Sequence, residues 1–528
     1  MFRVLVSDKL GAAGLELLDQ AEDAEYDMKT GLSKDELIAI LPDYDALIVR
    51  SSTKVDADVL AAGTNLKVVG RAGVGVDNID VAAASQRGII VMNTPTSNNI
   101  ATAEEAMALM LVASRYTVPA HNALAEGLWE RSKFVGYELF GKTLGVIGFG
   151  RIGRLVTERA QAFGMEVIAY DPYVSEEVGR ELDVTLVDLE DLFPAADYIT
   201  LHTAVTPETE HIINEAALAQ MKKGVVIVNG ARGKLIDEQA LADALQSGKV
   251  RAAGVDVYST EPPENNPLIG LPNVIHTPHL GASTKEAQRE VARNMVEQIL
   301  DALRGVDFRH AVNMPFQVGP GDYQKVQPYM NLAEKIGRLQ AGLADSPITT
   351  VEIEASGDAV QARVKAIAAA LLKGILSVNY EGVLNAINAP VVAEQQGITM
   401  TQTRDMHGID YPNLISCKVS WEGGDCVVGG VLFGGTEPRI VQVNNYTLEA
   451  RPEGVVLIMQ NQDVPGVIGQ IGTVLAAYEI NIGEWRMGRN QPGAQALSFI
   501  NLDSEPPAEA LAALSEITAV TQLKLITI

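Results

Sequence analysis

The residues of this chain best suited to move a proton and hold a carboxylate are His279, Glu261 and Arg232. Each follows a short apolar run that predicts a buried strand, and open α/β sheets bind ligands at the carboxyl ends of their strands. A carboxylate beside an imidazole orients its tautomer and stabilises its charged form. The planar fork of Arg232 suits bidentate binding of a carboxylate. A lone loop histidine is more often structural, and Arg232 could be a surface residue in a tight turn, so these residues predict a candidate site without establishing one.

A glycine-rich turn predicts a dinucleotide site. Gly148, Gly150 and Gly153 follow an apolar run and precede a helix-like segment, so they suit a tight bend, backbone approach to a pyrophosphate and close helix packing. A second apolar run ends at Asp171, roughly the expected 20 residues onward. Its carboxylate would accept the ribose hydroxyls of NAD and repel the extra phosphate of NADP. An ordinary glycine turn followed by a structural aspartate is the alternative.

The composition limits the class of protein. A net charge of -26 over 528 residues argues against nucleic acid or an anionic membrane as a partner. Cys417 and Cys426 are too few for a disulfide framework or a multi-cysteine metal site, so we expect no metal and a reduced, cytoplasmic setting. The chain begins with a strand-like run, which leaves no room for a signal peptide. No uncharged apolar run is long enough to span a bilayer.

The elements that must position these residues follow an α/β pattern. Short apolar runs alternate with helix-like segments from residue 1 to about 95. A strong helix pattern at 100–113 precedes the glycine-rich turn, and another at 284–303 follows the last nucleotide-domain strand. We therefore expect a doubly wound, Rossmann-like nucleotide domain at 97–284, inserted in a first domain formed by 1–96 and 285–315.

The remaining residues predict two further domains. Residues 316–451 combine a long alanine-rich helix pattern at 359–376 with a glycine-rich strand pattern at 426–433, and they contain no chemical motif, so an α+β scaffold is expected. Residues 452–528 show the order β-α-β-β-α-β, which is the ferredoxin-like plan.

Four ordered motifs together carry a resemblance to a known family. GFGRIG at 148–153, NGARG at 229–233, GVDVYSTEPP at 254–263 and TPHLGAST at 277–284 resemble the D-isomer-specific 2-hydroxyacid dehydrogenases. The length is similar to the family's long form, which adds an intervening domain and a C-terminal ACT domain. The resemblance implies a flavodoxin-like first domain. It also implies that His279 is the acid/base, Glu261 its partner and Arg232 the carboxylate anchor.

The resemblance also implies further binding residues. It implies NAD contacts at Val74, Arg151, Ile152, Thr203, Gly230, Ala231, Asp256, Leu280, Gly281 and Ala282. The family usually has Thr, Ser or Cys where Gly230 stands, a departure that changes little if backbone contacts dominate. Substrate contacts are implied at Arg50, Ser51 and Arg71, which follow predicted strands, and at Arg131, on a loop that can reach a neighbouring subunit.

The activity that the resemblance implies is oxidation of 3-phospho-D-glycerate to 3-phosphooxypyruvate with NAD, the first step of L-serine biosynthesis. The ACT-like tail implies L-serine as effector at Asn461, Asp463 and Asn481, although it could be a dimerisation domain without a ligand. Pairing of such tails and a substrate loop shared between subunits both require more than one chain, and we expect a homotetramer. The resemblance of the middle segment to the intervening domain implies that a second effector or a substrate-type anion binds there, with Arg439 and Arg451 as candidates. The alternatives are a glyoxylate or hydroxypyruvate reductase on the same fold and a non-catalytic NAD-sensing protein.

Overall fold

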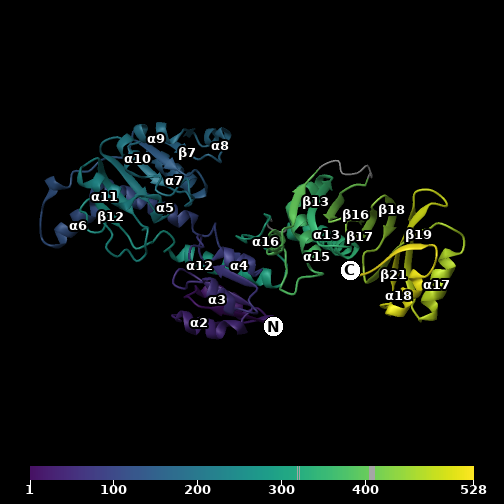
Figure 1. The fold of residues 1–528 in the computed structure, drawn as a ribbon. Coiled ribbons are helices and arrows are strands. Elements are labelled where there is room, and N and C mark those ends of the chain that lie inside the picture. Colours follow the sequence, from purple (N-terminus) through teal and green to yellow (C-terminus); the bar gives the residue numbers. More distant parts are fainter. Residues whose placement is uncertain (318, 320–321, 404–410) are drawn as a thin grey trace. The chain divides into compact units, whose positions relative to one another are not determined.

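The computed structural model describes residues 1–317, 319, 322–403 and 411–528 (Figure 1). These residues fold into two units. Unit 1 comprises Met1–Leu10, Leu17–Asn93 and Met295–Ile528, and unit 2 comprises Gly11–Glu16 and Thr94–Asn294. Helices α1 (Ala12–Asp19) and α12 (Lys285–Leu303) contribute residues to both units. The two units are groups of residues with many contacts among themselves, and they do not test the four domain boundaries expected above, which stay predictions.

Unit 2 is built on a parallel sheet with the strand order β12-β11-β10-β9-β6-β7-β8. Its strands are β6 (Thr143–Ile147), β7 (Glu166–Tyr170), β8 (Thr185–Leu186), β9 (Tyr198–Leu201), β10 (Val225–Asn229), β11 (Val250–Val255) and β12 (Val274–His276). Its helices are α5 (Asn99–Arg115), α6 (Thr117–Ala125), α7 (Arg151–Ala162), α8 (Glu176–Glu181), α9 (Leu189–Ala195), α10 (Glu215–Gln220) and α11 (Glu238–Gln246), with short 3₁₀ turns η2 (Arg131–Lys133) and η3 (Gly233–Leu235).

The central strand β10 shows why the sheet of unit 2 is covered on both faces. Val226 and Val228 pack into an apolar cluster with α5 and α7, whereas Val225 and Ile227 pack into another with α9, α10 and α11. Successive side chains of a strand point to opposite faces, so a continuous apolar run is what a doubly covered strand requires. Each of these side chains is at most 1 % exposed, and such burial stabilises the fold by about 1.5–3 kcal/mol per residue. The doubly wound nucleotide fold predicted from the sequence is confirmed.

The N-terminal part of unit 1 is also a parallel α/β sheet, with the strand order β2-β1-β3-β4-β5. Its strands are β1 (Phe2–Val6), β2 (Ala24–Met28), β3 (Ala46–Val49), β4 (Val68–Arg71) and β5 (Ile90–Met92). The accompanying helices are α2 (Lys34–Ile40), α3 (Ala57–Ala62) and α4 (Val81–Gln86), with a 3₁₀ turn η1 (Leu41–Asp43). Chain order places β5 before all strands of unit 2 and the end of α12 after them, as expected for an inserted nucleotide domain.

The middle of the chain is a mixed α+β region of unit 1. Its sheet has the order β14-β13-β15-β16-β17-β18. The strands are β13 (Ile348–Ser356), β14 (Thr399–Gln402), β15 (Leu414–Trp421), β16 (Gly424–Phe433), β17 (Glu437–Val443) and β18 (Tyr446–Ala450), and the helices are α13 (Tyr323–Leu343), α14 (Asp358–Gln361), α15 (Val364–Leu376) and α16 (Ala389–Gln395).

The single helix predicted at 359–376 is wrong in one respect, because the structure divides it into α14 and α15. The side chain of Asn413 accepts a hydrogen bond from the Ala359 N–H at 3.2 Å and holds the short first helix. Arg363, the second of the two residues between the helices, has a ψ of 10° and does not continue α14.

The C-terminal part of unit 1 follows the predicted order. It runs β19 (Val455–Gln462), α17 (Val467–Ala477), β20 (Ile482–Arg489), β21 (Gln495–Leu502), α18 (Ala508–Ser515) and β22 (Val520–Thr527). The sheet is antiparallel with the order β20-β21-β19-β22. The ferredoxin-like plan is confirmed.

Candidate active site

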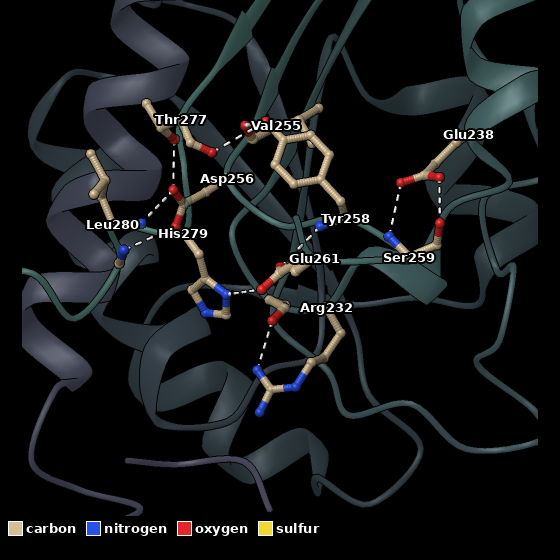
Figure 2. A network of polar contacts seen from close by, with 12 residues as sticks. Arg232, Glu238, Val255, Asp256, Tyr258, Ser259, Glu261, Thr277, His279 and Leu280 are labelled. Atoms are coloured by element: carbon tan, nitrogen blue, oxygen red, sulfur yellow. Dashed lines mark hydrogen bonds and ion pairs between the residues drawn. The ribbon is translucent and has the colours of Figure 1, made fainter. Parts of the chain in front are cut away.

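The candidate active site lies at one edge of the unit 2 sheet. Val255, the last residue of β11, pairs with Asn229 at the end of β10 and with His276 at the end of β12. Because these parallel strands end at the same level, the loops that follow them open at one edge. These loops carry Arg232, Glu261 and His279, so the sheet brings the predicted residues together (Figure 2).

His279 and Glu261 form a hydrogen-bonded pair. His279 Nδ1 lies 2.8 Å from Glu261 Oε2, and Figure 2 shows the imidazole facing the carboxylate. An ionised carboxylate only accepts hydrogen bonds, so the proton lies on Nδ1 and the Nε2 of a neutral imidazole keeps its lone pair. The side chains are 45 % and 39 % exposed, which leaves the pair accessible to a substrate.

The electrostatics of Glu261 favour its charged form. Burial alone would raise the pKa of this carboxyl, but the hydrogen bond and charge of His279, the Tyr258 N–H and the charge of Arg232 together lower it. The Tyr258 N–H donates to Oε1 at 3.1 Å, while Oε2 faces the imidazole. Both carboxylate oxygens are thus oriented.

Arg232 comes from the turn after β10. Asn229, 1 % exposed, shapes this turn, because its Nδ2 donates to the Arg232 carbonyl at 2.9 Å and its Oδ1 accepts from the Ala231 N–H at 3.0 Å. Arg232 Nη1 donates to the Ala231 carbonyl at 2.7 Å. A Cβ on Gly233 would lie 1.9 Å from the Tyr258 carbonyl carbon, so the arginine loop and the glutamate loop touch backbone to backbone.

Glu238 and Tyr258, two residues that hold the loop around Glu261, were not predicted as site residues from the sequence. Glu238, in the first turn of α11, accepts from the Ser259 N–H at 2.9 Å and from its Oγ at 2.5 Å, and this holds the glutamate loop (Figure 2). Burial, together with the charges of Asp256, Glu261 and Glu238, raises the pKa of Tyr258 to about 12, and its hydroxyl lies 3.2 Å from the Thr277 carbonyl. Asn229 opens the NGARG motif at 229–233, and Glu238 follows Asp237, the N-cap residue of α11, so both positions left a signal in the sequence.

The predicted dinucleotide turn lies between β6 and α7. Gly148 has φ +95°, and a Cβ there would lie 2.6 Å from the His202 carbonyl, which explains the need for glycine. A Cβ at Gly150 would have no heavy atom of another residue within 4 Å apart from its chain neighbours, so the backbone there is open to a ligand. Asp171 follows β7, and its carboxylate accepts from the Phe149 N–H at 2.9 Å and from the Tyr173 N–H at 3.0 Å.

The other predicted cofactor residues of unit 2 lie around this edge. Arg151, Ile152 and Gly153 form the first turn of α7, and Thr203 follows β9. Gly230 and Ala231 follow β10, Asp256 follows β11, and Leu280, Gly281 and Ala282 follow β12. Asp256 is fully buried. Arg131 lies in the exposed turn η2.

The predicted residues of unit 1 lie at the ends of two neighbouring parallel strands, because Val49 at the end of β3 pairs with Arg71 at the end of β4. Arg50 and Ser51 directly follow β3, Arg71 ends β4, and Val74 lies in the loop beyond it. Arg50 Nη1 lies 3.5 Å from the Lys9 carbonyl, and Arg71 Nη1 donates to the Gly75 carbonyl at 2.6 Å. The Asp8 carboxylate accepts from the Arg50 N–H at 2.6 Å and shapes this loop.

The predicted effector residues lie in the C-terminal sheet of unit 1. Asn461 is 1 % exposed, and its side chain bonds the Gln462 carbonyl and the Ser498 hydroxyl. Asp463 accepts from Arg489 Nη1 at 3.1 Å and from the Gly493 N–H, and these hydrogen bonds lower the pKa of its carboxyl. Asn481 Nδ2 donates to Asp503 at 2.6 Å.

The described residues contain neither a metal-binding cluster nor a helix that could span a membrane. No cluster of His, Cys, Asp and Glu side chains among them is arranged to hold a metal ion. None of the helices that they form is long and apolar enough to cross a membrane.

Comparisons with known proteins agree with this arrangement. Residues 107–281 match the NAD binding domain of the D-isomer specific 2-hydroxyacid dehydrogenases, and residues 325–444 match the D-3-phosphoglycerate dehydrogenase intervening domain. A D-3-phosphoglycerate dehydrogenase of Methanocaldococcus jannaschii is 43 % identical over 100 % of both chains. Another, from Archaeoglobus fulgidus, is 41 % identical over 98 % of both chains. The NAD-dependent formate dehydrogenase of Staphylococcus aureus, solved with NAD, is 30 % identical with a TM-score of 0.53, covering 58 % of this chain and 97 % of its own.

Proposed function

Because this chain belongs to the D-3-phosphoglycerate dehydrogenases of the D-isomer-specific 2-hydroxyacid dehydrogenase family, we propose that it oxidises 3-phospho-D-glycerate to 3-phosphooxypyruvate with NAD at the His279–Glu261 pair. The reaction opens L-serine biosynthesis. The observation that carries the assignment to this pair is the 2.8 Å contact at the carboxyl edge of a dinucleotide-type sheet. The full-length relatives favour this activity over a glyoxylate or hydroxypyruvate reductase and over an NAD-sensing protein without turnover.

The residues at the glycine-rich turn fit NAD. None of the described side chains caps the N-terminus of α7, so the N–H groups of its first turn can bind a pyrophosphate. The space above Gly150 allows the phosphates to approach the backbone. Asp171 would accept the ribose hydroxyls at the far end. Bound NAD supplies the acceptor for the hydride that leaves C2 of the substrate.

The role of His279 is proton transfer. Its Nε2 lone pair accepts the C2 hydroxyl proton, since Nδ1 donates to Glu261. Glu261 then lies 2.8 Å from the imidazolium and offsets its charge. In the reverse direction the same imidazolium returns the proton to the carbonyl oxygen.

The role of Arg232 is to bind the substrate carboxylate. A bidentate ion pair fixes both the position and the rotation of the carboxylate, and so selects the face of C2 that is presented. Arg50, Ser51, Arg71 and Arg131 stay proposed contacts for the rest of the substrate, with arginines supplying the charge that a phosphate requires.

Turnover tests this proposal directly. We expect NADH formation from 3-phospho-D-glycerate and NAD, followed by absorbance with the product trapped. His279→Gln should lower kcat by about 10²- to 10⁴-fold, the usual contribution of a general base, while NAD titration shows binding retained. His121→Gln, on the exposed surface of α6, is the matched control and should keep full activity. Undiminished turnover in His279→Gln would refute the assignment.

Regulation by L-serine is part of the proposal. The positions of two residues support them as effector contacts. Asp463 directly follows β19, and Asn481 directly precedes β20. Pairing of such domains requires more than one chain, and a homotetramer is the proposed assembly. We expect serine to inhibit turnover and Asn481→Ala to raise the serine concentration for half inhibition. Inhibition unchanged by Asn481→Ala would exclude this site.

A further inference from the structure

The loop that carries His279 has an unusual backbone. His279 has φ +55°, in the left-handed region that residues with a Cβ rarely adopt. Such a conformation persists only where the surrounding structure holds it, and it is common at functional sites. His279 therefore needs something to keep its backbone in this state.

Asp256 supplies the contacts that hold this conformation. Its backbone carbonyl accepts from the His279 N–H at 2.9 Å. Its carboxylate accepts from the Leu280 N–H at 2.6 Å and from the Gly281 N–H at 2.9 Å, and Oδ1 also accepts from Thr277 Oγ1 at 2.6 Å (Figure 2). Successive N–H groups around a left-handed residue converge on one point and form an anion-binding concavity. The anion in this concavity is the carboxylate of Asp256.

The position of Asp256 makes this contact a link between the loop and the sheet. Asp256 directly follows β11, whereas the loop follows the neighbouring strand β12. The residue is 0 % exposed, so the sheet and its surroundings fix the carboxylate. Thr102 of α5 donates to the Gly281 carbonyl at 3.2 Å and holds the far end of the loop.

We propose that Asp256 is a positioning residue for His279, beyond the cofactor contact that the family resemblance implies. The carboxylate clamps the loop so that the His279 imidazole faces Glu261 in the orientation needed for proton transfer. The effect of Asp256 on turnover rests on the proposed function. The effect of Asp256 on the loop conformation does not depend on the reaction.

The test uses the full chain with Asp256→Asn, which keeps the size of the side chain. An amide has one acceptor oxygen, so its NH₂ group would face an N–H group of the loop. A displacement of about 1 Å at a catalytic group costs about 100-fold in rate. We therefore expect kcat to fall about 100-fold, with a smaller loss in NAD affinity from the cofactor contact. A larger loss in NAD affinity than in kcat would overturn the proposal and make Asp256 a cofactor ligand alone.

Hydrogen exchange of the peptide that contains residues 279–281 gives a readout independent of activity. In Asp256→Asn this peptide should exchange about tenfold faster, as expected for loss of a hydrogen bond to a charged group. His279→Gln should leave its exchange unchanged. Unchanged exchange in Asp256→Asn would refute the clamp, whereas faster exchange in a chain without turnover would refute only the proposed reaction.

Control variants separate positioning from general stability. Asp197→Asn makes the same change at the opposite edge of the sheet, where the carboxylate accepts from the Thr143 N–H at 3.0 Å, so it should lower the melting temperature without changing kcat. Thr277→Ser keeps the hydroxyl donor and should retain activity, whereas Thr277→Val should lower kcat. On a His279→Gln background, Asp256→Asn should lower turnover no further. An additional 100-fold loss there would show that Asp256 acts independently of His279.

Discussion

Glu261→Gln removes the charge beside His279 while keeping the shape of the side chain. The amide oxygen can still accept the Nδ1 proton, so the imidazole keeps its tautomer, while the amide NH₂ group then faces the Tyr258 N–H in place of Oε1. What is lost is the attraction between the carboxylate and the imidazolium that forms as the substrate is oxidised. The structure places the two groups 2.8 Å apart, with 39 % of the Glu261 side chain exposed.

The magnitude follows from this distance and exposure. Two unit charges 4 Å apart interact by about 1 kcal/mol in water and about 4 kcal/mol at an effective dielectric constant of 20. A half-exposed pair lies between these limits, so we expect a loss of about 2–3 kcal/mol. If the interaction develops only as the proton moves, kcat falls by about 30- to 150-fold.

The assay is the initial rate of NADH formation from 3-phospho-D-glycerate at saturating NAD. Glu264→Gln is the matched control, because it removes a charge from the same loop at an exposed position and should leave kcat within about twofold. If Glu261→Gln retained wild-type kcat, the charge of Glu261 would have no part in the reaction, and the mechanism above would be wrong.

Further predictions concern the other residues of unit 2. Arg232→Lys should raise the KM for 3-phospho-D-glycerate about 10-fold or more, because an ammonium cannot bind the carboxylate through two parallel hydrogen bonds; an unchanged KM would exclude Arg232 as the anchor. Asp171→Asn should raise the ratio of kcat/KM with NADP to that with NAD by about tenfold, since the charge that repels the 2′-phosphate is lost; a constant ratio would contradict the assignment. Burial lowers the pKa of His202 to about 4, below its unfolded value, so the unfolded chain takes up a proton first and stability falls as pH drops from about 6.5 towards 4. Between pH 7.5 and 5.5 the free energy of unfolding of unit 2 should fall by about 1.4 kcal/mol more in the wild type than in His202→Gln. Hydrogen exchange of unit 2 peptides in increasing urea measures this free energy. Equal losses in both proteins would refute this reasoning.

Elements with a strong local signal could be predicted from the sequence. The strand β7 and Asp171 at its end were expected because the apolar run stops at a carboxylate. The division between α14 and α15 could not be predicted, because the alanine-rich pattern continues through Ala362 and Arg363 without a glycine or proline. The contact that holds the start of α14 comes from Asn413, which is 54 residues away from Ala359 and therefore absent from the helix's own segment.

In the candidate site, too, some features could be predicted from the sequence and others could not. The residue types and strand ends predicted that His279, Glu261 and Arg232 would meet, since parallel strands share an edge. The left-handed φ of His279 left no signal, because the sequence has no glycine there and the contacts from Asp256 depend on the relation between two strands. The burial of Asn461 was likewise unexpected, because its neighbours on adjacent strands decide which side chains reach the surface.

The backbone contact at Gly233 also determines which pieces of this site can be exchanged by protein engineering. Because a Cβ there would meet the Tyr258 carbonyl, a graft of the segment 230–233 onto another scaffold must bring the segment 256–261 with it. Substitutions at Gly230 or Ala231 can be screened one at a time, whereas any side chain at position 233 requires a redesigned partner loop. A library that aims at new substrates should therefore vary the two segments as a single cassette and keep Gly233 constant.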